Sequence, residues 1–315
     1  MSEHKRQGIY AAFDMGGTFI KASLMNDSGK IVKGTFGIFP ACSDQAAERI
    51  LNRITEILLH MLASCPDGAL KGIGFSFPGP FDYENGISYI RGLNKYDALY
   101  GINIREEIAG RVDERAKEFR KACSFKILFE NDASLFALGE CCKNKELQNT
   151  PVLCLTLGTG VGSAFLREGR LLKEDKDIPR NGWIYCCAYK DRQVEDYLSR
   201  RGVIELARER HISVREPAAL YGMAVQGNET ARKIWGEFGK QAGEILSPFM
   251  ERFGGKDLVL GGQIAKAAVF FLDELEKIAG NRYRVHIAVG KEDESVFQGI
   301  YQLLVRGIIY ESRRK

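Results

Sequence analysis

One structural device occurs twice in this chain. Residues 9–36 read as an apolar strand, a glycine pair, a second strand and a turn at 26–29. Residues 151–172, PVLCLTLGTGVGSAFLREGRLL, repeat that order of strand, glycine-rich turn, strand and hairpin turn. Such self-similarity indicates an internal duplication. The 315 residues should therefore fold as two related α/β domains.

Apolar periodicity predicts the remaining elements around the two copies. We expect strands at 9–13, 20–25, 30–36, 73–77, 125–129, 258–260 and 285–289. We expect helices over about 104–119, from near 133, across 194–210 and 228–250, over 295–310, and after Ser43 as a cap. Residues 81–101 and 173–193 look irregular. We place one domain at 1–124 plus 295–315 and the other at 125–294.

Composition excludes several classes of protein. The 45 basic and 41 acidic residues are mixed along the chain without a basic block, so no nucleic-acid partner is expected. No apolar run is long enough to span a membrane, and the first residues lack a signal-peptide pattern. We therefore expect a cytoplasmic protein with no membrane partner. The eight cysteines include no C-x-x-C and are read as free thiols.

The two glycine turns suit phosphate binding. Glycine lets backbone N–H groups approach an anion closely. Neither turn matches a P-loop or a dinucleotide-binding fingerprint. Each alone is explained as well by a tight hairpin, but one turn in each duplicated half favours two phosphate cradles. The residues concerned are Gly16, Gly17 and Thr18 in the first turn and Gly158, Thr159, Gly160 and Gly162 in the second.

Two carboxylates and a third glycine turn complete the candidate site. Asp14 sits beside the first turn, where a carboxylate can hold Mg²⁺ through water, although a lone Asp beside a turn is more often a cap. Asp132 ends a strand in ENDASLFALGE. The position of Asp132 fits two roles, an N-cap of the following helix and a general base in phosphoryl transfer. Gly261-Gly262 suits flat packing of a nucleotide against the backbone. The isolated histidines suggest no metal site.

These motifs resemble, in order and spacing, those of the ROK family of sugar kinases, repressors and uncharacterised reading frames. They are DMGGT, GIGFSFPGP, ENDASLFALGE, LTLGTGVGSAFLREGRLL and LVLGG, and they span nearly the whole chain. The resemblance implies the actin-like ATPase fold of two RNase H-like domains, with ATP and sugar in the interdomain cleft. It also suggests a homodimer, because members of the family are commonly dimers.

The resemblance implies a role for each matching residue. Asp14 and the first glycines correspond to the magnesium and phosphate site, the 158–162 turn to the second phosphate loop, and Gly261-Gly262 to the adenosine loop. Asp132 corresponds to the general base. The residues implied to bind sugar hydroxyls are Asn94, Asn131 and Glu195.

The chain also departs from the family pattern. Members usually carry G-E-x-G-H and then a C-x-C-G-x-x-G-C zinc motif before the sugar-binding glutamate. Here the stretch reads IPRNGWIYCCAYKDRQVEDYLS, so we predict no structural zinc. The missing acidic and histidine contacts leave the identity of the sugar open. The first hairpin begins about a dozen residues from Met1, so we do not expect the repressors' DNA-binding domain.

The sequence thus predicts an ATP-dependent sugar kinase that uses ATP and Mg²⁺, with glucose or N-acetylmannosamine favoured as acceptor. The alternative is a sugar-sensing or binding protein of the family, catalytically weak and without a DNA-binding domain. Retention of Asp132 argues against that alternative, because a pure binder needs no base. A chaperone ATPase of this fold would need a further substrate-binding domain.

Overall fold

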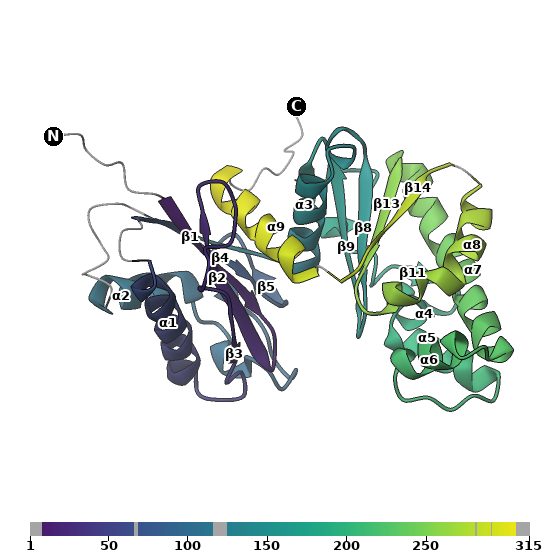
Figure 1. Cartoon of the computed structure of the whole chain (residues 1–315), viewed down its shortest axis with the longest axis horizontal. Coiled ribbons are helices and arrows are strands. Elements are labelled where there is room, and N and C mark those ends of the chain that lie inside the picture. Colours follow the sequence, from purple (N-terminus) through teal and green to yellow (C-terminus); the bar gives the residue numbers. More distant parts are fainter. Residues whose placement is uncertain (1–7, 66–68, 116–124, 281, 291, 307–315) are drawn as a thin grey trace. The chain divides into compact units, whose positions relative to one another are not determined.

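A computed structural model describes residues 8–65, 69–115, 125–280, 282–290 and 292–306 of the chain. The chain divides into two compact units. Unit 1 comprises Met1–Leu135 and Val296–Ile308, and unit 2 comprises Phe136–Ser295 and Ile309–Lys315. Each unit contains its own five-stranded mixed sheet (Figure 1). The predicted helix ends at 116–119 and 307–310 lie outside the described residues.

The sheet of unit 1 has the strand order β3-β2-β1-β4-β7. β1 pairs antiparallel with β2 and parallel with β4, which in turn pairs parallel with β7. Buried strands of a parallel sheet read as apolar runs, which is why the 9–13 and 73–77 segments were recognisable. The strands are β1 (Gly8–Met15), β2 (Phe19–Asn26), β3 (Gly37–Pro40), β4 (Ala69–Ser76) and β7 (Lys126–Glu130).

Helices and aromatic rings build the core of unit 1. Helix α1 (Ala47–Ala63) buries the apolar stripe that the helical spacing predicted. Phe75 of β4 stacks on Phe13 at 5.0 Å and on Phe129 at 4.9 Å between ring centroids. The other elements are β5 (Phe81–Asp82), β6 (Ile87–Ser88), η1 (Asp97–Leu99), α2 (Ile104–Arg115), α3 (Asp132–Lys143) and α9 (Glu292–Arg306). The boundary between the two units falls inside α3 and again inside α9.

The sheet of unit 2 repeats that topology, with the order β10-β9-β8-β13-β14. β8 and β9 form the antiparallel hairpin, and β8, β13 and β14 run parallel. Because two sheets of one order follow one another in the chain, the predicted duplication is confirmed. The strands are β8 (Val152–Leu157), β9 (Val161–Arg167), β10 (Arg170–Leu172), β13 (Asp257–Gly261) and β14 (Arg284–Ala288).

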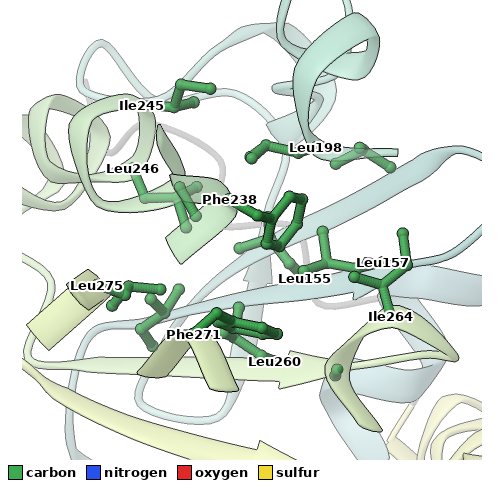
Figure 2. Close-up of a cluster of buried hydrophobic side chains, with 14 of the residues drawn as sticks. Leu155, Leu157, Leu198, Phe238, Ile245, Leu246, Leu260, Ile264, Phe271 and Leu275 are labelled. Carbon is green, nitrogen blue, oxygen red and sulfur yellow. The ribbon is translucent and has the colours of Figure 1, made fainter. Parts of the chain in front are cut away.

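Two helices pack against the sheet of unit 2 and contribute large apolar side chains to its core. Phe238 of α7 (Glu229–Phe253) points toward Leu155 of β8, and Phe271 of α8 (Ala268–Ala279) lies near Leu260 of β13 (Figure 2). The other elements are η2 (Leu147–Asn149), η3 (Arg180–Gly182), β11 (Ala188–Tyr189), β12 (Arg192–Gln193), α4 (Val194–Leu198), α5 (Arg200–Glu209), α6 (Pro217–Val225) and η4 (Ile264–Ala267). Across the described ranges, no helix has the length and apolar character needed to cross a membrane.

Three local predictions differ from the structure. The third strand of the first hairpin is β3, not residues 30–36. In that segment the hydroxyl oxygen of Thr35 accepts a hydrogen bond from the Leu24 N–H at 3.1 Å. Ile31 forms only an isolated β-bridge with Met25. Ser43 does not cap α1, whose N-cap is Ala46 without a side-chain bond. β7, which we placed in the C-terminal domain, is the edge strand of the first sheet, because it pairs with β4.

Candidate active site

The first glycine turn connects β1 and β2 in unit 1. Asp14, half-buried, lies at the end of β1, and Thr18 is exposed. A Cβ at Gly16 would lie 2.6 Å from the carbonyl oxygen of Phe19, so only glycine fits there. Among the described residues, the N–H groups of Gly17 and Thr18 have no protein acceptor. The turn therefore offers the backbone donors that a phosphate needs.

Side chains from distant segments hold the carbonyl groups of this turn. The buried phenol of Tyr96 donates to the Gly16 oxygen at 2.7 Å, and the hydroxyl of Ser43 donates to the Gly17 oxygen. The N–H of Ala41 donates to the Thr18 oxygen at 2.9 Å. Burial raises the pKa of Tyr96 far above its usual value, and the Asp14 carboxylate raises it further. The phenol thus stays protonated and remains a donor.

A tight loop at 92–97 contains the exposed Asn94 and contacts this hairpin through Lys95 and Tyr96. The carboxylate of Asp97 accepts the N–H groups of Gly92 and Leu93, and the Tyr96 N–H donates to the Ser43 oxygen at 2.6 Å. The side chain of Lys95 lies against the first turn, because a Cβ at Gly17 would be 3.1 Å from its Cδ. The sequence motifs indicated Asn94 as a candidate site residue, but not Ser43, Lys95 or Tyr96. The available signal was the long irregular segment 81–101, because such segments are often functional.

Asp132 is the first residue of α3, and Asn131 precedes it. The Asn131 Oδ1 accepts the N–H of Ala133 at 3.0 Å, and the Asp132 Oδ1 accepts the same N–H at 2.9 Å. Asn131 thus shares the capping function that the sequence left open for Asp132. The Asp132 side chain is open to solvent. Surrounding protein nevertheless desolvates the carboxylate and raises its pKa, against the opposing effects of the Ala133 N–H, Lys95 and Asn131.

The second glycine turn connects β8 and β9 in unit 2. Its shape is fixed by a bond of 3.0 Å from the Gly158 N–H to the Gly160 oxygen and by one of 2.8 Å from the Arg200 N–H to the Gly158 oxygen. Glu195, in α4, contacts the turn from one side. Its Oε2 accepts the N–H of Val161 at 3.2 Å, and a Cβ at Gly160 would come within 2.8 Å of that oxygen. Glu195, which we expected to bind the sugar, therefore also stabilises the second turn.

A cavity of about 260 Å³ opens beside this second turn. Thr159 forms part of its wall, together with the aromatic rings of Tyr221 and Trp235. The buried Nε1 of Trp235 has no hydrogen-bond partner within the described part of the chain. A phosphate cradle next to an aromatic-walled cavity fits a nucleotide. The remaining lining residues are Gly158, Arg200, Glu216, Pro217, Ala218, Gln263, Ile264, Lys266 and Ala267.

The third glycine turn directly precedes residues that line this cavity. A Cβ at Gly261 would lie 2.3 Å from the Phe136 ring, and one at Gly262 would lie 2.4 Å from the Leu157 oxygen. Gly262 also has φ = 88°, which favours glycine. The cavity wall begins one residue later, at Gln263. Gly162, in β9, pairs with Thr156 and lies within the sheet rather than in the turn.

The segment that replaces the family's zinc motif is held by hydrogen bonds and aromatic contacts. The Ser163 hydroxyl donates to the Gly182 oxygen at 2.7 Å and accepts the Ile184 N–H at 3.0 Å. Tyr189 donates to Glu244 at 2.9 Å. Within the ranges that the structure describes, no group of three or more histidine, cysteine or acidic side chains is arranged to hold a metal.

Two units of one sheet topology, each with a glycine turn at its strand ends, define the actin-like ATPase class of α/β protein. The ROK family model matches residues 10–288. The chain belongs to the ROK family.

Named relatives agree with this assignment. The chain is 29% identical over 160 residues to a glucokinase of Thermotoga maritima, covering 50% of this chain and 44% of that protein. It is 24% identical over 276 residues to an N-acetyl-D-glucosamine kinase of Haemophilus influenzae. That match covers 82% of this chain and 84% of that protein. The crystal structure of a glucokinase from Parabacteroides distasonis matches with a TM-score of 0.76 at 24% identity, over 97% of this chain and 99% of that one.

Proposed function

We propose that this protein is an ATP-dependent sugar kinase that transfers the γ-phosphate of ATP to a hydroxyl of a hexose or N-acylhexosamine. The single observation that carries the proposal is Asp132, a solvent-accessible carboxylate at the start of α3 in the unit that also holds the first glycine turn. The cavity beside Thr159 supplies the nucleotide site. Membership of a family that includes sugar kinases supports this assignment.

In the proposed reaction, Asp132 takes the proton of the sugar hydroxyl as its oxygen attacks the γ-phosphorus. The new O–P bond forms while the bond to the β-phosphate oxygen breaks, and ADP leaves with that electron pair. Asn131 and Asn94 hold the sugar hydroxyls. The free N–H groups of Gly17 and Thr18 stabilise the charge on the phosphoryl oxygens. General-base help of this kind contributes roughly 10²- to 10⁴-fold in rate.

Asp14 fits the magnesium role that the family implies. Mg²⁺ keeps several waters and uses one or two carboxylates plus substrate phosphates. Asp14 provides one half-buried carboxylate beside a turn with free backbone donors, which suits a water-mediated site. The ion would neutralise charge on the triphosphate when bound.

The candidate acceptors come from the named relatives and from the sugar-binding positions of this chain. The named relatives act on glucose and on N-acetyl-D-glucosamine. Glu195 accepts a hydrogen bond from the Val161 N–H, and the histidine of the family's G-E-x-G-H sequence is absent from this chain. We therefore propose glucose, N-acetylglucosamine and N-acetylmannosamine as the first acceptors to test.

Replacement of Asp132 by Asn tests the proposal. The amide keeps the shape of the side chain but cannot accept the proton, so kcat should fall by about 10²- to 10⁴-fold while sugar binding is retained. Because desolvation raises the pKa of Asp132, wild-type kcat/KM should fall with decreasing pH in a range above the ordinary aspartate pKa. ADP release coupled to NADH oxidation, measured for each sugar, is the readout.

Asp273→Asn, a change in α8 of unit 2, is the matched control and should leave kcat unchanged. Sugar-dependent ADP release that survives Asp132→Asn would contradict the role of the base. Tight sugar binding by the wild type without turnover would instead support the sugar-sensing alternative.

A further inference from the structure

We propose that Lys95 is a catalytic residue: its ammonium group binds the phosphoryl group during transfer, at the first glycine turn. The inference rests on the kinase function proposed above and adds a cation that neither the family motifs nor the sequence patterns indicated. Lys95 lies in unit 1, in the 92–97 loop. Its place in that loop, its charge and its neighbours each support the assignment.

The backbone around Lys95 is fixed against the phosphate-binding turn. Asn94 and Tyr96 both have left-handed conformations, with φ of 55° and 59°, which are uncommon for residues other than glycine. The Tyr96 phenol and N–H bond to Gly16 and Ser43 on the turn side. The tether therefore comes one residue after Lys95, so the backbone at Lys95 is held against the turn.

The side chain of Lys95 lies along the first turn. A Cβ at Gly17 would be 3.1 Å from its Cδ and 3.6 Å from its own Cβ. Its charge acts on the carboxylate of Asp132 and lowers the pKa of that group, against desolvation, which raises it. Asp14 of β1 and Glu130 of β7 both pair with Ser76 of β4, so the first turn and Asp132 follow at the same end of the sheet. The half-buried lysine lies against that turn.

The charge of Lys95 is available to a substrate. Among the described residues, no carboxylate lies within ion-pair distance of its ammonium group, whereas Lys143 and Lys277 each pair with a glutamate of their own helix. A strongly hydrated ammonium that is held in place without a partner binds an anion as a point charge.

The position of Lys95 suits interaction with both the phosphoryl group and Asp132 in the transfer step. As the sugar O–P bond forms and the bond to ADP breaks, negative charge spreads over the three equatorial phosphoryl oxygens. A cation held there stabilises that charge more than it stabilises ground-state ATP, so it raises kcat rather than merely tightening binding. Its charge also favours the ionised form of Asp132, which accepts the hydroxyl proton.

Lys95→Met and Lys95→Arg in the full-length protein test the inference, with Lys30→Met as the matched control. Lys30 is an exposed lysine of the same unit, beyond the end of β2 away from the glycine turn. We expect Lys95→Met to lower kcat by about 10²- to 10³-fold, as loss of one transition-state donor does, with a smaller change in KM for ATP. Lys95→Arg should retain part of the activity, and Lys30→Met should behave as wild type.

The pH profile separates catalysis from a structural role. Removal of the lysine charge should move the acidic limb of kcat/KM to higher pH, because Asp132 then loses a proton less readily. Equal kcat and an equal acidic limb in Lys95→Met and Lys30→Met would overturn the inference, and so would a loss of kcat matched by a fall in melting temperature. A wild type without sugar-dependent ADP release would instead refute the proposed function.

Discussion

At the scale of single residues, the site depends on buried hydrogen bonds that the sequence motifs do not contain. Gly16 and Gly17 were recognisable because a glycine-rich turn between two strands recurs in the second half of the chain. Tyr96 was not, because it lies 80 residues further along the chain and nothing local to it indicates a partner. Its phenol is 0% exposed, so loss of the bond leaves a carbonyl without its donor.

Tyr96→Phe should raise KM for ATP and destabilise the protein by about 1–3 kcal/mol, the usual effect of an unsatisfied buried group. Tyr83→Phe is the control, because its phenol donates to the Phe77 oxygen at 3.0 Å away from the glycine turn. Steady-state kinetics and urea unfolding are the measurements. An ATP KM that is unchanged in Tyr96→Phe, or raised equally in both variants, would argue against a phosphate-binding role for the turn.

At the scale of elements, local patterns predicted the strands and helices better than the junctions between them. The apolar stripe of α1 and the strands around both glycine turns could be read from spacing alone. The start of α1 could not, because Ser43, a good N-cap by type, bonds to Gly17 across the fold instead. The same competition moved the third strand to β3, since Thr35 bonds to Leu24 before the chain extends.

The β13–β14 pair of unit 2 contains a charge network with a testable pH dependence. The side chain of Asp257 is fully buried. Its carboxylate accepts from Arg284 at 2.8 Å and from Thr150 at 2.6 Å, and the His286 ring nitrogen lies 2.7 Å away. Burial would raise the pKa of Asp257, but these partners together hold it below the usual value.

Asp257→Asn should therefore lower the free energy of unfolding by about 1–3 kcal/mol near neutral pH. A carboxyl whose pKa is lower in the folded than in the unfolded state stabilises the fold above about pH 4, and that contribution is lost as pH falls through the folded-state pKa. Urea unfolding of both proteins across this range should show the difference shrink toward acid. A difference that is constant with pH would exclude the charge as its source.

At the scale of the whole molecule, the duplication is what the sequence predicted most firmly. Two sheets of the same strand order follow from two copies of one strand-turn-strand device. Contacts between residues far apart in the chain could not be predicted, since a single sequence contains no signal for them. The aromatic wall of the cavity is one example, formed by Tyr221 of α6 and Trp235 of α7 beside the turn at Thr159.

Phosphate transfer itself tests the central claim most directly. Wild-type protein is incubated with γ-³²P-labelled ATP and Mg²⁺, with and without each of the three sugars, and the products are separated. We predict label in a sugar phosphate, formed in equal amount to ADP and nearly absent with Asp132→Asn. Label found only in inorganic phosphate, at the same rate with and without sugar, would contradict a sugar kinase.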